Sequence, residues 1–213
     1  MAKQSKSKAK RKTSAWFQRH THDTFVKKAQ VEGKRSRAAF KLTEILDKHG
    51  LQLKQDAVVV DLGCAPGSWS AEIAKRLSEE GLLVGIDLLP LESIQGAVLM
   101  QADFSSNEGR AELAKVLQGR KANLVLSDMA PEMSGHRIVD QARMIGLNEL
   151  TLDFAVNHLR ENGHLLMKTF MGDGFDQFRK ELAGWFRSVK IIKPAASRKD
   201  SPEIFLLAQQ FRG

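Results

Sequence analysis

The sequence lacks, or has few of, several residue types that particular classes of protein require. Its 213 residues include no tyrosine, so no phenolic hydroxyl takes part in its chemistry. A single cysteine, Cys64, excludes an internal disulfide framework and suits a reducing compartment. No stretch approaches the roughly 18 consecutive apolar residues of a membrane span, and the six histidines have no metal-ligand spacing. We therefore expect neither a membrane partner nor a metal site.

Acidic residues are scarce in the N-terminal part of the chain. The first 41 residues hold 13 of the 33 lysines and arginines but only two acids, and the remainder is close to neutral. Positive charge concentrated in this way predicts a polyanionic partner, with nucleic acid as the leading candidate and a merely solubilising tail as the alternative. Residues 1–14 have almost no apolar side chains and should be disordered without a partner.

The basic start of the chain also bears on its localisation. No apolar stretch follows it, which argues against a secretory signal. A mitochondrial transit peptide is disfavoured less strongly, because residues 1–14 are rich in lysine rather than arginine and have no apolar face. We therefore expect a cytoplasmic protein.

Beyond the basic segment, apolar segments of strand type alternate with helical segments. The first helical segment, Ser36–His49, repeats apolar residues every three or four positions and stops at Gly50. Strands are predicted at 57–61, 82–87, 98–103, 123–128, 163–170, 189–193 and 204–210, with further helices at 68–80, 108–117, 138–161 and 175–186. This order predicts an α/β fold with a doubly wound, mostly parallel sheet of seven strands, the last two antiparallel to each other. We expect a catalytic domain of residues 35–213 behind a basic arm of residues 1–34.

Four successive predicted strands end in an acid. These residues are Asp61, Asp87, Asp103 and Asp128. One such acid is commonly a turn or helix cap. Ligands of doubly wound sheets bind at the carboxyl ends of the strands, so four acids at this edge predict one ligand crevice.

A glycine-containing loop follows the first strand and opens a helix. Gly63 and Gly67 allow a tight turn and a close approach of backbone to ligand. The loop does not match the dinucleotide fingerprint, and Pro66 removes an N–H where a diphosphate would need a donor. It therefore suits a nucleoside ligand without a diphosphate, such as S-adenosylmethionine.

Such a ligand gives the neighbouring residues distinct roles. Asp87 is placed to accept hydrogen bonds from ribose hydroxyls, and Asp103 to accept one from the adenine amino group. Trp69 either packs on the sheet or flanks the cofactor. The candidate cofactor-binding residues are Asp61, Gly63, Pro66, Gly67, Trp69, Asp87, Asp103 and Asp128.

Six segments in order along the chain carry a resemblance to a known family. They are Arg-Ser-Arg-Ala-Ala-Phe-Lys-Leu at 35–42, Asp-Leu-Gly-Cys-Ala-Pro-Gly-Ser-Trp at 61–69, Asp-Leu-Leu-Pro at 87–90, Ser-Asp-Met-Ala-Pro-Glu-Met-Ser-Gly at 127–135, Leu-Met-Lys-Thr-Phe at 166–170 and Ser-Pro-Glu-Ile-Phe at 201–205. The sequence resembles the FtsJ/RlmE-type ribosomal RNA ribose 2′-O-methyltransferases. This resemblance implies a Rossmann-like, S-adenosylmethionine-dependent fold. It also implies a catalytic tetrad, which falls on Lys41, Asp128, Lys168 and Glu203.

The tetrad has a chemical rationale. A ribose 2′-hydroxyl is a poor nucleophile and must lose its proton during attack on a sulfonium methyl group. A lysine in a crevice can act as the base when burial or a second cation favours its neutral form. Lys168 is the predicted base, with Lys41 as the second cation and Glu203 orienting Lys41. Asp128 acts on Lys168 in the opposite sense, so the net effect stays open.

The chain departs from the family at Phe205, two residues after the tetrad glutamate, where a tyrosine is usual. We predict that Phe205 is either a core residue or a stacking surface. Cys64 is predicted to be a small loop filler.

The substrate follows in part from the chemistry. A 2′-hydroxyl target restricts the substrate to RNA. The arm is predicted to contact RNA phosphates through Arg11, Lys12, Lys34, Arg35 and Arg37. The resemblance implies large-subunit ribosomal RNA, with a uridine as the usual target, and we expect a monomer acting at the stage of the ribosomal subunit.

Three alternatives stay open at this point. The nearest is a ribose methyltransferase of transfer RNA or of an mRNA cap, which the residues alone do not distinguish. A non-catalytic RNA-binding or ribosome-assembly protein is the second, and the intact tetrad argues against it. A small-molecule methyltransferase is the third, and it would not need a cationic arm.

Overall fold

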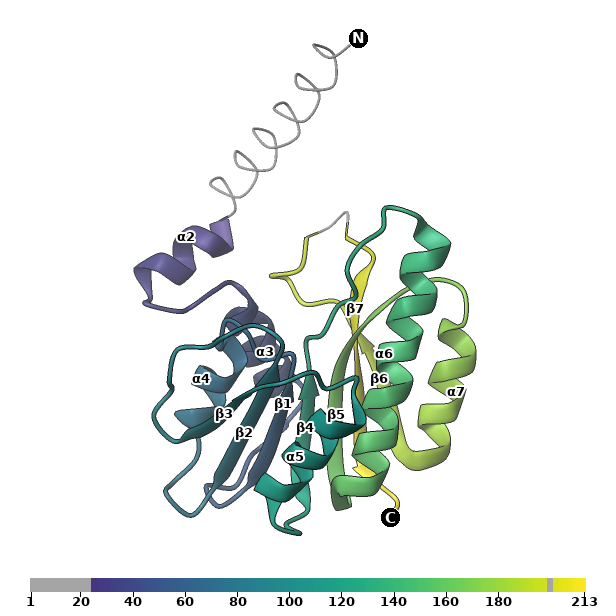
Figure 1. The fold of residues 1–213 in the computed structure, drawn as a ribbon. Helices are drawn as coiled ribbons and strands as arrows, with labels where there is room; N and C mark the ends of the chain where they lie inside the picture. Colours follow the sequence, from purple (N-terminus) through teal and green to yellow (C-terminus); the bar gives the residue numbers. More distant parts are fainter. Residues whose placement is uncertain (1–23, 199–200) are drawn as a thin grey trace.

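The computed structural model describes residues 24–198 and 201–213, which form one seven-stranded sheet with helices on both faces (Figure 1). The strands are β1 (Val58–Leu62), β2 (Leu82–Asp87), β3 (Ala97–Gln101), β4 (Ala122–Ser127), β5 (Leu159–Phe170), β6 (Phe186–Ile192) and β7 (Glu203–Phe211). The helices are α2 (Thr24–Val31), α3 (Ala38–Lys48), α4 (Ser68–Ala74), α5 (Asn107–Leu117), α6 (Arg137–His158) and α7 (Phe175–Trp185).

The sheet order is β3-β2-β1-β4-β5-β7-β6. The pairs β1–β2, β1–β4, β2–β3 and β4–β5 are parallel, whereas β7 is antiparallel to both β5 and β6. The predicted fold, a doubly wound and mostly parallel sheet with two closing antiparallel strands, is confirmed. The strand order reverses direction at β1 and β4, and this switch point is where doubly wound sheets bind ligands.

Several predicted boundaries were wrong, among them the ends of two helices and of the third strand. The long helix ends at His158 instead of Glu161, because Leu159 already pairs with Ala122 as the first residue of β5. The helix α4 ends at Ala74 instead of Glu80, since Ser78 N–H donates to the Gln55 carbonyl and the chain turns away. The third strand ends at Gln101, which leaves Asp103 two residues beyond it.

The helix α2 lies within residues 1–34, the segment predicted to be a basic arm. Its Phe25 ring lies 5.9 Å from the Phe40 ring of α3, and Ala29 is buried. The predicted arm residues before Thr24 lie outside the described part of the chain. The division between arm and catalytic domain at residue 34 stays a prediction.

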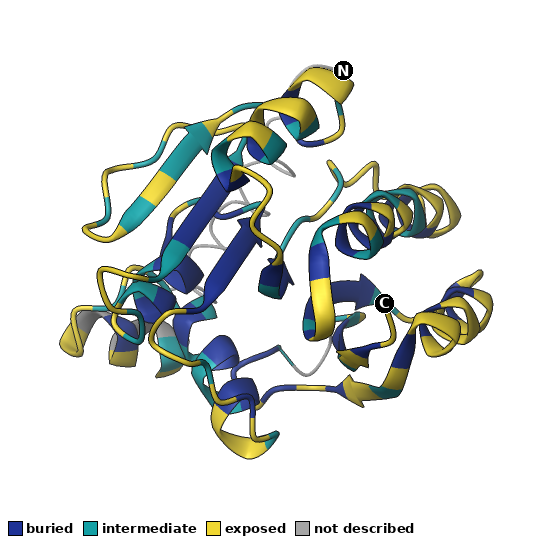
Figure 2. Cartoon of the chain, turned by 90° about the horizontal axis from the view of Figure 1, so that it is seen from below, coloured by how far each residue is buried: buried dark blue, intermediate teal, exposed yellow. Residues whose placement is uncertain are grey.

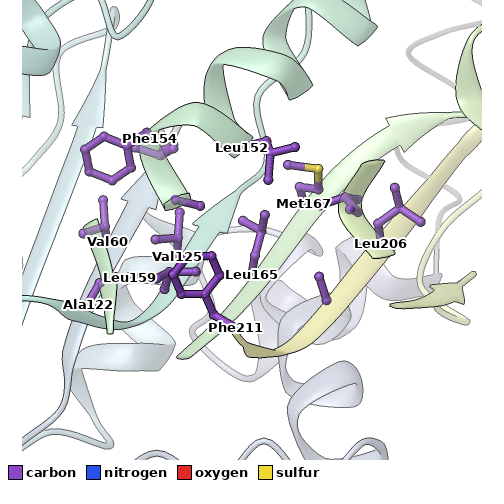
Figure 3. Close-up of a cluster of buried hydrophobic side chains, with 14 of the residues drawn as sticks. Val60, Ala122, Val125, Leu152, Phe154, Leu159, Leu165, Met167, Leu206 and Phe211 are labelled. Carbon is purple, nitrogen blue, oxygen red and sulfur yellow. The ribbon is translucent and has the colours of Figure 1, made fainter. Parts of the chain in front are cut away.

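Two apolar clusters fill the two faces of the sheet. The larger lies beneath α5, α6 and α7, and it joins Val60, Val125, Leu165 and Leu206 from four neighbouring strands (Figure 3). The smaller lies beneath α3 and α4 and includes Leu42 and Val59, among others. Figure 2 shows the central strands as a continuous buried layer between exposed helix faces. In this described part, no helix has the length and apolar character that crossing a membrane would need.

Candidate active site

A cavity of about 710 Å³ opens at the carboxyl ends of the central strands. Three of the four predicted acids line it, namely Asp87, Asp103 and Asp128, together with Gly63 of the glycine loop. The predicted crevice is therefore present where the sheet reverses its strand order.

The carboxylate of Asp87 is fixed by two backbone donors. Its Oδ2 accepts a hydrogen bond from Ala65 N–H at 2.8 Å, and its Oδ1 accepts one from Leu89 N–H at 2.8 Å. A carboxylate oxygen has two lone pairs, so each oxygen keeps capacity for a ligand hydroxyl. Asp87 thus joins the glycine loop to the end of β2 and presents acceptors to the cavity.

Asp103 is an exposed acceptor on the same cavity. Its Oδ1 accepts hydrogen bonds from the Ser105 hydroxyl at 2.7 Å and the Ser105 N–H at 2.8 Å. These bonds lower the pKa of Asp103 below its ordinary value. The carboxylate is therefore ionised at neutral pH, as an acceptor for a ligand amino group must be.

Asp61 does not line this cavity, which corrects the expectation that all four acids share one crevice. The strand β1 continues one residue further to Leu62, so Asp61 is an interior residue of the strand and is fully buried. Its Oδ2 accepts a hydrogen bond from the Ser70 hydroxyl at 2.6 Å, whereas its Oδ1 has no hydrogen bond. Burial, with a smaller contribution from the negative charge of Asp128, raises the pKa of Asp61 to about 7 against the lowering effect of Ser70.

Replacing Asp61 by asparagine is expected to change how stability depends on pH. Since the folded pKa is about 7 and the ordinary value is 3.8, the stability associated with the protonated group is complete below about pH 4 and is lost as the pH rises through 7. The variant cannot ionise, so its free energy of unfolding relative to the wild type should increase between about pH 4 and about pH 8. Urea unfolding at both pH values measures this difference. A difference that stays constant would show that Asp61 does not titrate in this range.

Pro66, Gly67 and Trp69 of the glycine loop are not among the residues that line the main cavity. Pro66 and Trp69 line a second cavity of only about 20 Å³, together with Asp61 and Asp128. Gly67 has a φ of 89°, a left-handed conformation that favours glycine. The loop residues therefore shape the backbone around the site, and Gly63 is the predicted loop glycine that reaches the main cavity wall.

Trp69 packs on the sheet, which decides between the two predicted roles. Its side chain is buried, its Nε1–H donates to the Ala38 carbonyl at 2.9 Å, and its ring lies 5.7 Å from the Phe205 ring. Phe205 is fully buried and is thus a core residue. Cys64 is also buried, and burial raises the pKa of its thiol.

Two of the tetrad residues, Lys168 and Asp128, form a close pair. The Nζ atom of Lys168 lies 3.0 Å from Asp128 Oδ1 and donates a hydrogen bond to the Asp128 carbonyl oxygen at 2.5 Å. The Asp128 Oδ1 atom itself is buried and makes no hydrogen bond of good geometry, so it is an ion-pair partner with acceptor capacity left. Only 10% of the Lys168 side chain is exposed.

The other two tetrad residues form a second pair. Lys41 Nζ donates to Glu203 Oε1 at 2.6 Å, and the Ser197 hydroxyl donates to the same oxygen at 2.9 Å. Burial alone would raise the pKa of Glu203, but Lys41, Ser197 and the charge of Lys168 together lower it below its ordinary value. Glu203 is therefore an ionised partner that holds Lys41 in place.

The strand β7 brings the two pairs to one site. Phe170 pairs with Glu203, and Lys168 pairs with Phe205, in the antiparallel register of β5 and β7. Lys41 Nζ lies 5.5 Å from the centre of the Phe205 ring, on the side of α3. Two buried ammonium groups and two carboxylates thus meet at the end of β5, beside the main cavity.

The predicted RNA-contacting residues divide into two groups. Arg11 and Lys12 lie outside the described residues. Lys34 pairs with the buried Glu72 at 3.2 Å and keeps only 14% of its side chain exposed. Arg35 donates one hydrogen bond to the Pro66 carbonyl of the glycine loop and one to the Ser93 carbonyl. Lys34 and Arg35 are therefore engaged within the protein, and phosphate contact by Arg37 stays a prediction.

Sequence reasoning missed the apolar walls of the cavity. Leu88, Phe104 and Met129 line it, and each directly follows a predicted acid in the sequence. The signal was therefore available, since residues next to the strand-end acids share the same loops. Together these side chains provide an apolar slot between acidic rims, which suits a flat ring with polar substituents.

The comparison with known families agrees with this geometry. The family model described as FtsJ-like methyltransferase matches residues 34–211. The chain belongs to this family. As a member it is a methyltransferase, and the matched range contains the glycine loop and all four tetrad residues.

Curated relatives of this FtsJ-like methyltransferase cover nearly the same length. A protein of Acinetobacter baumannii named ribosomal RNA large subunit methyltransferase E is 46% identical over 202 residues, which is 95% of this chain and 93% of the relative. A protein of the same name from Azoarcus sp. is 45% identical over 205 residues, 96% of this chain and 100% of the relative.

Solved structures share the fold. A protein of Plasmodium falciparum assigned as a ribosomal RNA methyltransferase has a TM-score of 0.74 at 28% identity, over 84% of this chain and 99% of that one. A protein of Clostridium thermocellum assigned as an rRNA methylase has a TM-score of 0.54 at 17% identity, over 80% of this chain and 97% of that one, and supports the fold alone.

Proposed function

We propose that this methyltransferase transfers a methyl group from S-adenosylmethionine to the ribose 2′-oxygen of a uridine in large-subunit ribosomal RNA. The observation that carries the proposal is the pairing of Lys168 with Asp128 beside a cavity that carries nucleoside-type acceptors. The names of the curated relatives support the choice of ribosomal RNA. With this substrate, the protein is expected to act in the cytoplasm.

The residues around the cavity fit S-adenosylmethionine. Asp87 offers acceptors for ribose hydroxyls, Asp103 offers one for an adenine amino group, and Phe104 and Leu88 offer apolar walls for the ring. The buried Asp128 Oδ1, which lacks a hydrogen bond, would be satisfied by the ammonium group of the methionine part. When bound, this cofactor supplies a methyl group on a positively charged sulfur.

Lys168 would accept the proton of the ribose 2′-hydroxyl. Its Nζ lies 3.0 Å from Asp128 Oδ1, and this neighbouring carboxylate would stabilise the ammonium that forms. The proton would move from the hydroxyl oxygen to Nζ while the oxygen bonds to the methyl carbon, and the methyl–sulfur bond would break to leave a neutral thioether. Lys41, held by Glu203, adds a positive field beside the oxygen as it gains negative charge.

The deciding experiment maps the methylated nucleotide. Pure protein is incubated with labelled cofactor and with undermethylated large ribosomal subunits, naked ribosomal RNA or transfer RNA. We expect label on a ribose of large-subunit ribosomal RNA. Label on a base, on protein or on transfer RNA would contradict the proposal.

The basic arm is proposed to supply affinity for RNA. Replacing Arg11 and Lys12 by glutamine is expected to weaken RNA binding and to reduce the slope of log K against log salt. The reduction should be about 0.9 for each phosphate that the protein no longer neutralises, or about 0.7 on single-stranded RNA. Filter binding over a series of salt concentrations measures the slope. An unchanged slope would show that these side chains do not touch phosphate.

A further inference from the structure

Arg35 spans two backbone segments beside the cofactor loop. Its Nη1 donates a hydrogen bond to the Pro66 carbonyl at 3.0 Å, and its Nη2 donates one to the Ser93 carbonyl at 3.3 Å. Glu92 lies 3.9 Å from Nη2 but is almost fully exposed, so this ion pair adds little. The planar guanidinium is suited to two carbonyls at once, because its donors form a rigid fork.

The guanidinium lies close to the backbone of the next loop residue, Gly67, whose φ of 89° favours glycine. A Cβ atom on Gly67 would lie 3.0 Å from Arg35 Nη1 and 2.8 Å from Ile94 Cδ1. The guanidinium therefore covers the loop backbone directly, with no side chain between them.

Two further bonds fasten the same stretches of chain to each other. The Ser36 and Ser68 hydroxyls are 2.7 Å apart, and Trp69 Nε1–H donates to the Ala38 carbonyl at 2.9 Å. The segment that leads into α3 is thus attached to the loop and to the start of α4 along its length. Arg35 is the member of this set that also reaches beyond α4, to the loop between β2 and β3.

The loop backbone is consequently held at two successive residues. Asp87, which lines the cavity, accepts from Ala65 N–H, and Arg35, which is not among the lining residues, donates to the Pro66 carbonyl. A loop whose backbone must fit closely around a ligand loses affinity when it is free to move, because binding must then order it.

We propose that Arg35 is a positioning residue of the cofactor site, which holds the glycine loop in its binding conformation, and that it is not a phosphate contact. This inference rests on the proposed use of S-adenosylmethionine. On this inference, segment 35–42, the first of the family-like segments, has two roles. It positions Lys41, and through Arg35 it holds the cofactor loop in place.

The test measures cofactor affinity and RNA binding in the same variants. Arg35→Ala is expected to weaken binding of S-adenosylhomocysteine about tenfold, which corresponds to ~1.4 kcal/mol. Arg35→Lys, which keeps the charge but donates to one carbonyl at a time, should weaken it about threefold. The KM for the cofactor should rise in parallel, while kcat at saturating cofactor and the salt dependence of RNA binding stay unchanged. Isothermal titration, steady-state kinetics and filter binding provide these readouts.

Controls separate positioning from charge and from folding. S-adenosylmethionine is more positively charged than S-adenosylhomocysteine. If Arg35 only repelled this positive charge, Arg35→Ala would tighten the binding of S-adenosylmethionine. A positioning role predicts the opposite result, weaker binding. Lys28→Ala removes a cation of α2 that is 57% exposed and should leave cofactor affinity unchanged. If Arg35→Ala does not fold, Arg35→Lys decides.

The possible outcomes are distinct. Wild-type cofactor affinity in the Arg35 variants would overturn the inference, and a salt slope reduced by about one would reassign Arg35 to phosphate. Failure of the wild-type protein to bind S-adenosylhomocysteine would contradict the proposed function instead.

Discussion

Replacing Lys168 by alanine is expected to reduce the rate of methyl transfer by about 10²- to 10⁴-fold, the usual contribution of a general base. The loss should appear in kcat, because Lys168 acts on the hydroxyl during the reaction. Lys168 is not on the wall of the main cavity, so S-adenosylhomocysteine should bind with nearly wild-type affinity. Single-turnover transfer of labelled methyl to ribosomal subunits measures the rate, and isothermal titration measures the affinity.

A matched control comes from the same sheet. Lys190 of β6 is an exposed strand lysine remote from Asp128, and Lys190→Ala should retain wild-type turnover. Full activity in Lys168→Ala would remove Lys168 from its assigned role. A loss of cofactor affinity equal to the loss in rate would instead make Lys168 part of the binding site.

The strand-end acids show what a sequence can and cannot predict at this edge. Asp87 and Asp128 were correctly placed, because an apolar run followed by an acid marks the end of a buried strand. Asp61 carries the same signal, yet Leu62 continues the strand and turns the carboxylate into the interior. A one-residue difference in strand length decides the exposure of that side chain, and strand boundaries are not fixed by local pattern.

The contacts between distant segments were beyond local reasoning. Lys41 and Glu203 are 162 residues apart, and their contact depends on α3 packing over β7. The resemblance to the FtsJ/RlmE-type family grouped them, whereas helical periodicity alone places a lysine on a solvated face. Arg35 was placed by its basic segment among the phosphate contacts, whereas the fold directs this side chain to backbone carbonyls that no local pattern indicates. Its contact with phosphate stays an untested prediction.

Glu203→Gln is expected to lower the free energy of unfolding by about 3–5 kcal/mol, the usual effect of removing one partner of a buried ion pair. The side chain of Lys41 is only 6% exposed, so its ammonium group would remain buried without a counter-charge. The lowered pKa of Glu203 sets the pH dependence. Its contribution is present above the ordinary value of 4.5 and is lost as the pH falls through the lowered pKa. Urea unfolding at about pH 7 and about pH 3 should therefore show a difference that shrinks on acidification.

A double variant distinguishes the structural from the catalytic part of this pair. Lys41→Met with Glu203→Leu removes both charges and should recover most of the stability, since apolar residues of similar size often replace a buried ion pair without cost. Its transfer rate should stay at least about tenfold below wild type, because the positive field beside the reacting oxygen is gone. Lys48→Met, which removes an exposed partner of Glu44, should change neither stability nor rate appreciably. Recovery of both stability and rate in the double variant would show that Lys41 and Glu203 only hold the fold together, and the field at the 2′-oxygen would then come from Lys168 and the cofactor alone.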